Sequence, residues 1–126
     1  MLMVILYNMG IKDQLRDNIN EFRKEAERAK KDNSYNSAIT LFFKAIAVLT
    51  DLFLLGKEGY IPSNHTERFG ILKKKYGELY IILDRAFPLY QQTYRLKLGK
   101  EHLEVIENDF RKLVELTKID LNNKGD

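Results

Sequence analysis

Residues 35–55 decide the fold, and they read YNSAITLFFKAIAVLTDLFLL. Apolar residues recur in this stretch every three or four positions, which is the spacing of one face of an α-helix. Further apolar residues fill much of the remaining circumference, and Lys44 and Asp51 are its few charges. A helix that is apolar nearly all round is either central in its domain or covers a subunit interface as well. The stretch therefore predicts such a helix, with Gly56 as its left-handed stop.

Amphipathic stripes of the same period lie on both sides of this stretch. They predict helices over residues 11–31, 64–87 and 100–119, and a short helical piece over 88–98. Asn64 is followed three residues later by Glu67, a pairing typical of a capping box at a helix start. The residue before a proline avoids helical geometry, so the sequence predicts a break near Phe87, just before Pro88.

The predicted fold class is all-α. A chain of 126 residues has the usual size of one domain, so we expect residues 1–126 to form a single domain. Residues 1–9 would be an N-terminal extension and residues 120–126 a frayed tail. Long helices joined by short connections favour an antiparallel up-and-down four-helix bundle, here with an extra short helix.

Composition argues against several classes of protein. The chain has no cysteine and only two histidines, far apart in sequence, so we expect no metal site and no cofactor. Phosphate-binding glycine loops and nucleophile elbows are missing from the sequence. The net charge is +3, with both signs interleaved, which argues against a duplex-DNA binder. The apolar run at residues 1–7 is shorter than the ~20 residues of a membrane span, so we expect no membrane association and a cytoplasmic protein.

One pair of residues stands out chemically. Arg95 precedes His102 with six residues between them, and His102 falls in the first turn of the last predicted helix. Arginine can clamp a phosphate, and histidine moves protons near neutral pH. These are the parts for metal-free phosphodiester cleavage or for phosphate binding. By spacing alone, a surface arginine beside a helix-start histidine is the commoner arrangement.

The layout of the chain resembles the HEPN superfamily, which comprises small helical-bundle proteins of bacteria and archaea. The resemblance covers roughly residues 22–117. It is carried by SAITLFFKA at residues 37–45, by PSNH at 62–65, and by the stretch from Tyr94 and Arg95 to His102.

The resemblance implies a homodimer and two kinds of activity. In many HEPN proteins an arginine and a histidine meet in the dimer cleft and cut RNA without metal. The resemblance implies that Arg95 would hold the scissile phosphate and that His102 would serve as acid or base. Other members bind nucleotides, or pair with a separately encoded minimal nucleotidyltransferase. In that case His65, Arg68 and Tyr94 are the candidate nucleotide- or partner-binding residues.

Three functions follow as hypotheses. The first is a dimeric, non-catalytic module of the HEPN type that binds a nucleotide or a nucleotidyltransferase partner, as in a toxin–antitoxin pair. The second is a metal-independent endoribonuclease that uses Arg95 and His102. The third is a purely structural bundle. The apolar excess of residues 35–55 favours a homodimer independently of the resemblance.

Overall fold

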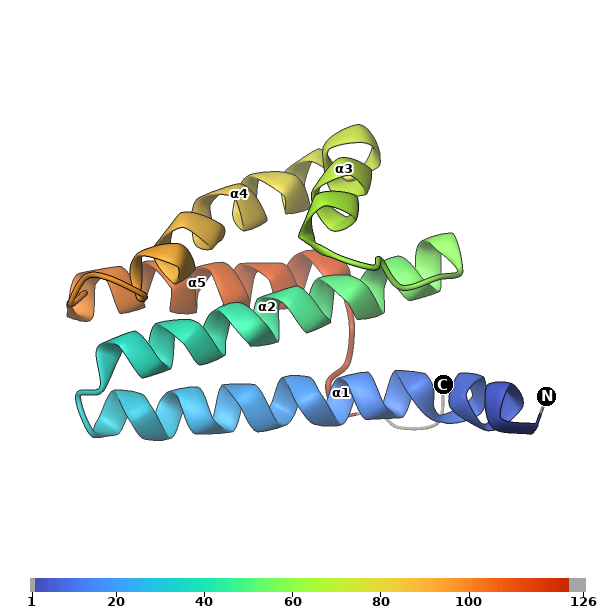
Figure 1. Cartoon of the computed structure of the whole chain (residues 1–126), viewed down its shortest axis with the longest axis horizontal. Coiled ribbons are helices and arrows are strands. Elements are labelled where there is room, and N and C mark those ends of the chain that lie inside the picture. Colours follow the sequence, from blue (N-terminus) through green and yellow to red (C-terminus); the bar gives the residue numbers. More distant parts are fainter. Residues whose placement is uncertain (1, 123–126) are drawn as a thin grey trace.

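The computed structural model describes the backbone of residues 2–122 and the side chains of residues 10–122. Over the described residues the chain is helical and has no strand, which confirms the all-α fold class. Its helices are α1 (Leu2–Lys31), α2 (Tyr35–Glu58), α3 (His65–Lys75), α4 (Gly77–Gln92) and α5 (Lys100–Thr117). Each long helix reverses the direction of the long helix before it, and the short α3 crosses between α2 and α4 (Figure 1).

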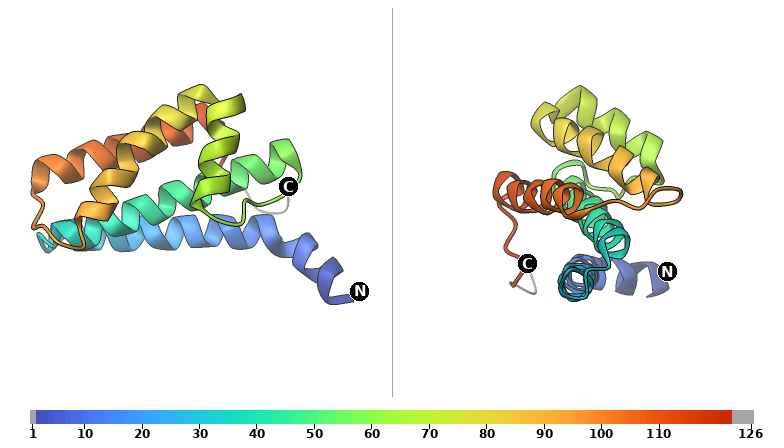
Figure 2. Two further views of the ribbon diagram at one scale, coloured as in Figure 1. Left: turned by 45° about the horizontal axis from the view of Figure 1, so that its top comes forward. Right: turned by 90° about the vertical axis from the view of Figure 1, so that its left-hand side faces the viewer.

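Helix α2 is the centre of the fold. It packs against α1 on one side and against α4 and α5 on the other, as the end-on view in Figure 2 shows. Large side chains from most of its circumference are fully buried, including Phe42, Ile46 and Leu49. Its length and composition alone would also suit a membrane span, but 67% of its most apolar window is buried inside this fold. The apolar excess of α2 is thus largely covered by helices of the same chain.

Two helix boundaries differ from the sequence prediction. Helix α2 runs past Gly56 and ends at Gly59, whose φ of +86° is left-handed and whose N–H donates to the Leu55 carbonyl. The predicted stop at Gly56 is therefore wrong by three residues, because both glycines could supply this conformation and only the loop geometry selects one.

The predicted break near Phe87 is also wrong. Helix α4 continues through Pro88 to Gln92, and the break comes earlier, at Tyr76. The Tyr76 backbone leaves helical geometry (φ −134°, ψ 65°) while its N–H still donates to the Leu72 carbonyl. A proline removes one hydrogen bond from a helix, but the helix can continue through it. Pro88 lies on an exposed turn, where water can reach the freed carbonyl.

Both ends of the chain differ in detail from expectation. Helix α1 begins at Leu2, so most of the predicted extension is helical, although the side chains of residues 1–9 lie outside the described part. After α5 the chain folds back on α1. The Arg16 side chain donates to the Asp120 carbonyl (3.2 Å) and Asn20 donates to the Leu121 carbonyl (2.9 Å). The predicted tail is thus anchored at its start, and residues 123–126 lie outside the described residues.

Candidate ligand-binding surface

His65 and Arg68 form one polar cluster with Asp51 of α2. Asn64 caps α3 by accepting from the Glu67 N–H at 2.9 Å, so His65 and Arg68 lie on the first turns of that helix. The Arg68 guanidinium donates Nε to one Asp51 oxygen (2.8 Å) and Nη2 to the other (2.9 Å). Its Nη1 contacts Nδ1 of His65 at 2.7 Å. The three side chains therefore hold one another in a fixed arrangement.

The environment of the His65 side chain favours its neutral form. Burial lowers the pKa of His65 below its usual value, the Arg68 charge lowers this pKa further, and Asp51 offsets part of the shift. Asp51 and Arg68 are each only 8% exposed, whereas the His65 residue is exposed. An accessible imidazole is thus supported by a buried ion pair.

A row of aromatic rings connects His65 with Tyr94. The His65 ring centroid lies 5.9 Å from that of Phe43 and 5.0 Å from that of Phe87. The Phe43 ring stacks on Tyr90 at 4.7 Å, and Tyr90 meets Tyr94 edge-on at 5.7 Å. We call these five rings, from His65 to Tyr94, the aromatic row. Phe43 forms its buried floor, and Tyr94 is 73% exposed.

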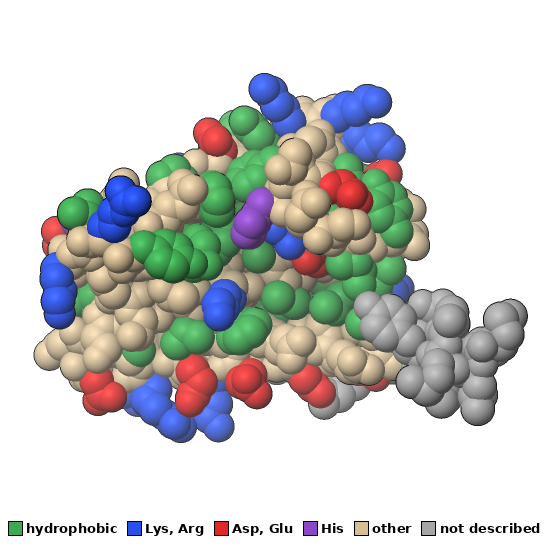
Figure 3. All heavy atoms as spheres, viewed as in Figure 1, with side chains coloured by type: hydrophobic (Ala, Val, Ile, Leu, Met, Phe, Trp, Pro, Cys, Tyr) green, Lys and Arg blue, Asp and Glu red, His purple; other side chains and the backbone are tan. Residues whose placement is uncertain are grey.

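The aromatic row joins residues that sequence analysis named separately. His65, Arg68 and Tyr94 are brought onto one surface, formed by α2, α3 and the end of α4. Hydrophobic side chains and a histidine gather on the face over these helices in Figure 3. Asp51 was missed as a member of this site. The available signal was a lone carboxylate in an apolar helix, since a buried charge needs a partner.

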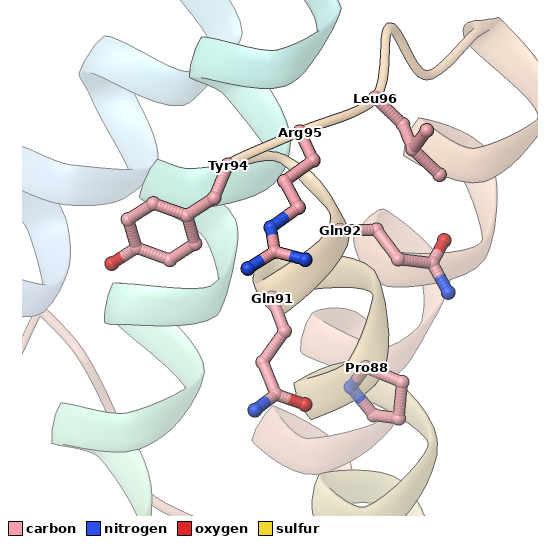
Figure 4. A pocket seen from close by; sticks show the side chains of 6 residues that line it. All are labelled: Pro88, Gln91, Gln92, Tyr94, Arg95 and Leu96. Carbon is pink, nitrogen blue, oxygen red and sulfur yellow. The ribbon is translucent and has the colours of Figure 1, made fainter.

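Arg95 lines an open hollow at one end of the aromatic row. The hollow has a volume of about 640 Å³. Figure 4 shows the Arg95 side chain lying between those of Tyr94 and Gln92 in this view. The complete lining is Pro88, Gln91, Gln92, Tyr94, Arg95 and Leu96. An aromatic ring, two amides and a guanidinium therefore line one hollow that is large enough for part of a small ligand.

His102 is engaged in capping α5. Its Nδ1 accepts the Gly99 N–H at 3.1 Å, which closes one half of a capping box at the helix start. Oε1 of Glu101 lies 3.5 Å from the same nitrogen, but that carboxylate is mostly exposed and the contact is too long for a good hydrogen bond. The histidine nitrogen nearer the backbone thus has a structural role.

The structure shows no contact between Arg95 and His102 within the described residues. Arg95 lines the hollow beside Tyr94 and His102 does not. Within the described residues, no hydrogen bond or ion pair joins the two side chains. Over the same residues, no cluster of three or more histidine, aspartate or glutamate side chains could hold a metal ion.

The lysine run at residues 73–75 lies away from this surface. All three lysines are exposed at the end of α3. Lys75 pairs with Glu58 at 2.8 Å, and Tyr76 donates to the other oxygen of that carboxylate at 2.6 Å. Both hydrogen bonds lower the pKa of Glu58, that of Lys75 more strongly. This contact ties the end of α3 to the end of α2.

Comparison with known proteins adds no relative to this description. No family model, no curated protein and no solved structure matches the chain. The functional argument therefore depends on the side chains of this surface.

Proposed function

We propose that this chain is a HEPN-type helical module that binds a nucleotide and does not cleave nucleic acid. In this proposal α1, α2, α4 and α5 correspond to an up-and-down four-helix bundle, and α3 is its extra short helix. The aromatic row and the hollow beside it form the binding surface.

The observation that carries the proposal is the continuity of the aromatic row with Arg95. Tyr94 ends the row and lines the same hollow as Arg95. Stacking of a base on an aromatic side chain contributes about 1–3 kcal/mol. Arginine donates bidentate hydrogen bonds to phosphate. A row of aromatic rings that ends beside a guanidinium therefore offers contacts to the two chemical halves of a nucleotide.

The position of His102 argues against a role as general base. Because Nδ1 of His102 accepts the Gly99 N–H, the ring proton of the neutral imidazole belongs on Nε2. A general base needs a free lone pair on the nitrogen that faces the substrate, and only Nε2 remains to face a substrate. Neutral His102 in this arrangement can donate through Nε2 but cannot accept there. The lack of a contact between Arg95 and His102 among the described residues supports the same interpretation.

The partners implied by the HEPN resemblance remain part of the proposal. They are a second copy of the chain and a nucleotidyltransferase, in a cytoplasmic setting. The burial of α2 inside the monomer removes the need for a second subunit to cover that helix. The homodimer therefore depends on the resemblance, and sedimentation of the purified protein at micromolar concentration tests it.

Titration calorimetry with AMP, GMP, CMP and UMP tests nucleotide binding. We expect at least one of them to bind the wild type, and Tyr94→Ala and Arg95→Ala each to weaken it roughly tenfold, as the loss of about 1.4 kcal/mol would do. Tyr60→Ala is the control, because Tyr60 is exposed but lies in the loop after α2, outside the aromatic row. Absence of binding to all four nucleotides, or equal affinity in the Tyr94 and Tyr60 variants, would contradict the proposal.

A further inference from the structure

The geometry points to a specific role for His65 at the far end of the aromatic row. We propose that Asp51 and Arg68 are positioning residues that present Nε2–H of His65 as a fixed hydrogen-bond donor. A neutral acceptor atom on a nucleotide base accepts this hydrogen bond. This inference rests on the proposed function and adds to it the orientation of the ligand.

Arg68 donates the hydrogen bond that joins it to His65. A guanidinium has only donors and stays charged at all ordinary pH values. The 2.7 Å contact from Nη1 of Arg68 therefore requires that Nδ1 of His65 be the acceptor. A neutral imidazole that accepts at Nδ1 carries its proton on Nε2. The tautomer of His65 is thus set by Arg68.

Asp51 holds the Arg68 side chain in place. The other two donor groups of Arg68 are occupied by the two oxygens of Asp51, at 2.8 and 2.9 Å. This fork fixes the plane of the guanidinium and leaves Nη1 directed at the imidazole. Asp51 never touches the ligand in this account. It acts on His65 through Arg68.

The neighbours of the His65 ring determine the orientation and the charge of the imidazole. The rings of Phe43 and Phe87 pack against it on α2 and α4, and neither carries a charge. The charged groups that act on it are Arg68 and Asp51, and Asp51 offsets part of the effect of Arg68. A positive charge on the ring would lie beside the Arg68 guanidinium and at the start of α3, and both disfavour it. The lowered pKa of His65 agrees with this arrangement.

The chemistry of the ligand follows from these surroundings. Asp51 takes the Nε and Nη2 donors of Arg68 and His65 takes its Nη1, so Arg68 has no free pair of donors for a phosphate. The half-buried Phe87 ring beside His65 offers an apolar contact to a neutral heterocycle. Base edges present carbonyl oxygens and ring nitrogens as acceptors. The base therefore lies along the aromatic row with its acceptor edge toward His65, and the phosphate lies at the Arg95 end.

The tautomer can be read directly from long-range ¹H–¹⁵N spectra of the wild-type protein near pH 7.5. The account predicts that Nδ1 of His65 is unprotonated and Nε2 carries the proton. A protonated Nδ1 in the neutral ring would overturn the role given to Arg68. In the double variant Asp51→Asn with Arg68→Gln, which removes both charges together, we expect this tautomer preference to weaken. An unchanged preference would also overturn it.

Affinities then test the ligand assignment, with the best-binding nucleoside monophosphate as probe. His65→Phe keeps an aromatic ring and removes the donor, so we expect a loss of roughly tenfold. His65→Gln keeps an N–H donor and should recover part of the affinity. Ribose 5-phosphate, which lacks a base, should bind wild type and His65→Phe equally well.

The outcomes separate this inference from the proposed function. If Tyr94→Ala weakens the nucleotide and His65→Phe does not, the nucleotide surface stands and the role of His65 is wrong. If His65→Phe weakens ribose 5-phosphate as much as the nucleotide, the phosphate end has been assigned to the wrong place. If the wild type binds no nucleotide, the proposed function fails and the ligand assignment fails with it.

Discussion

Arg68 and Asp51 form a bidentate ion pair between α3 and α2, with contacts of 2.8 and 2.9 Å. Both residues are 8% exposed. The pair is a buried polar link between the short helix α3 and the central helix, and the aromatic row begins beside it. The fold and the proposed binding surface therefore share this contact.

Removing one member of the pair should destabilise the protein strongly. Asp51→Ala leaves the Arg68 charge buried without its partner, and we expect a loss of about 3–5 kcal/mol in the free energy of unfolding. Chemical denaturation followed by circular dichroism measures it. The matched control is Arg28→Ala, which breaks an exposed pair with Glu25 and should cost less than about 1 kcal/mol. Equal losses in the two variants would show that the buried pair has no special role.

His65 should make stability depend on pH. Its pKa in the folded protein is lowered, first by burial and then by Arg68, so the unfolded chain binds the proton more readily. The folded state is thus favoured above the unfolded pKa of about 6.5, and this contribution is lost as pH falls from there through the folded pKa. Urea denaturation between pH 5.0 and 7.5 should show a decline toward low pH that is reduced in His65→Gln. If the His65 variant keeps it unchanged, His65 does not cause it.

The two glycines near the end of α2 should respond oppositely to alanine. Gly59→Ala places a side chain at a φ of +86° and should cost about 1 kcal/mol. Gly56→Ala adds a methyl group in open space within the helix and should stabilise by about 0.5–1 kcal/mol. Thermal unfolding of both variants checks the boundary at Gly59. A stabilised Gly59→Ala would place the helix end elsewhere.

RNA should survive incubation with the protein in excess EDTA. We expect no cleavage, because no contact joins Arg95 and His102 among the described residues and Nδ1 of His102 caps α5. Gel analysis of a broad panel of single-stranded RNAs measures this directly. Cleavage that survives the chelator and disappears in both Arg95→Ala and His102→Ala would restore the ribonuclease hypothesis.

Helical periodicity predicted the fold class, but it could not locate every helix end. The apolar stripe through Leu72, Tyr76, Leu79 and Leu83 continues without a change of phase, so it predicted one helix where the chain forms α3 and α4. The break at Tyr76 depends on where α3 packs, and only long-range contacts determine that. The cap at Asn64 was predictable because its hydrogen bond is local, three residues along the chain.

The candidate site was predictable to a smaller extent. Single residues such as His65 and Tyr94 could be named from the sequence because the resemblance to the HEPN superfamily implied them. Their connection could not be predicted, because it runs through Phe43 of α2 and Tyr90 of α4, 47 positions apart in the sequence. The same limit applies to Arg95 and His102, which are close in sequence but face different surroundings in the structure.

Mapping a bound nucleotide by NMR tests the central claim most directly. The ¹⁵N-labelled protein is titrated with the best-binding nucleoside monophosphate, and chemical-shift changes are followed along the chain. The account predicts that the largest changes fall at both ends of the aromatic row, at His65 and at Tyr94 with Arg95. Changes centred on His102 and the start of α5, with the aromatic row undisturbed, would contradict it.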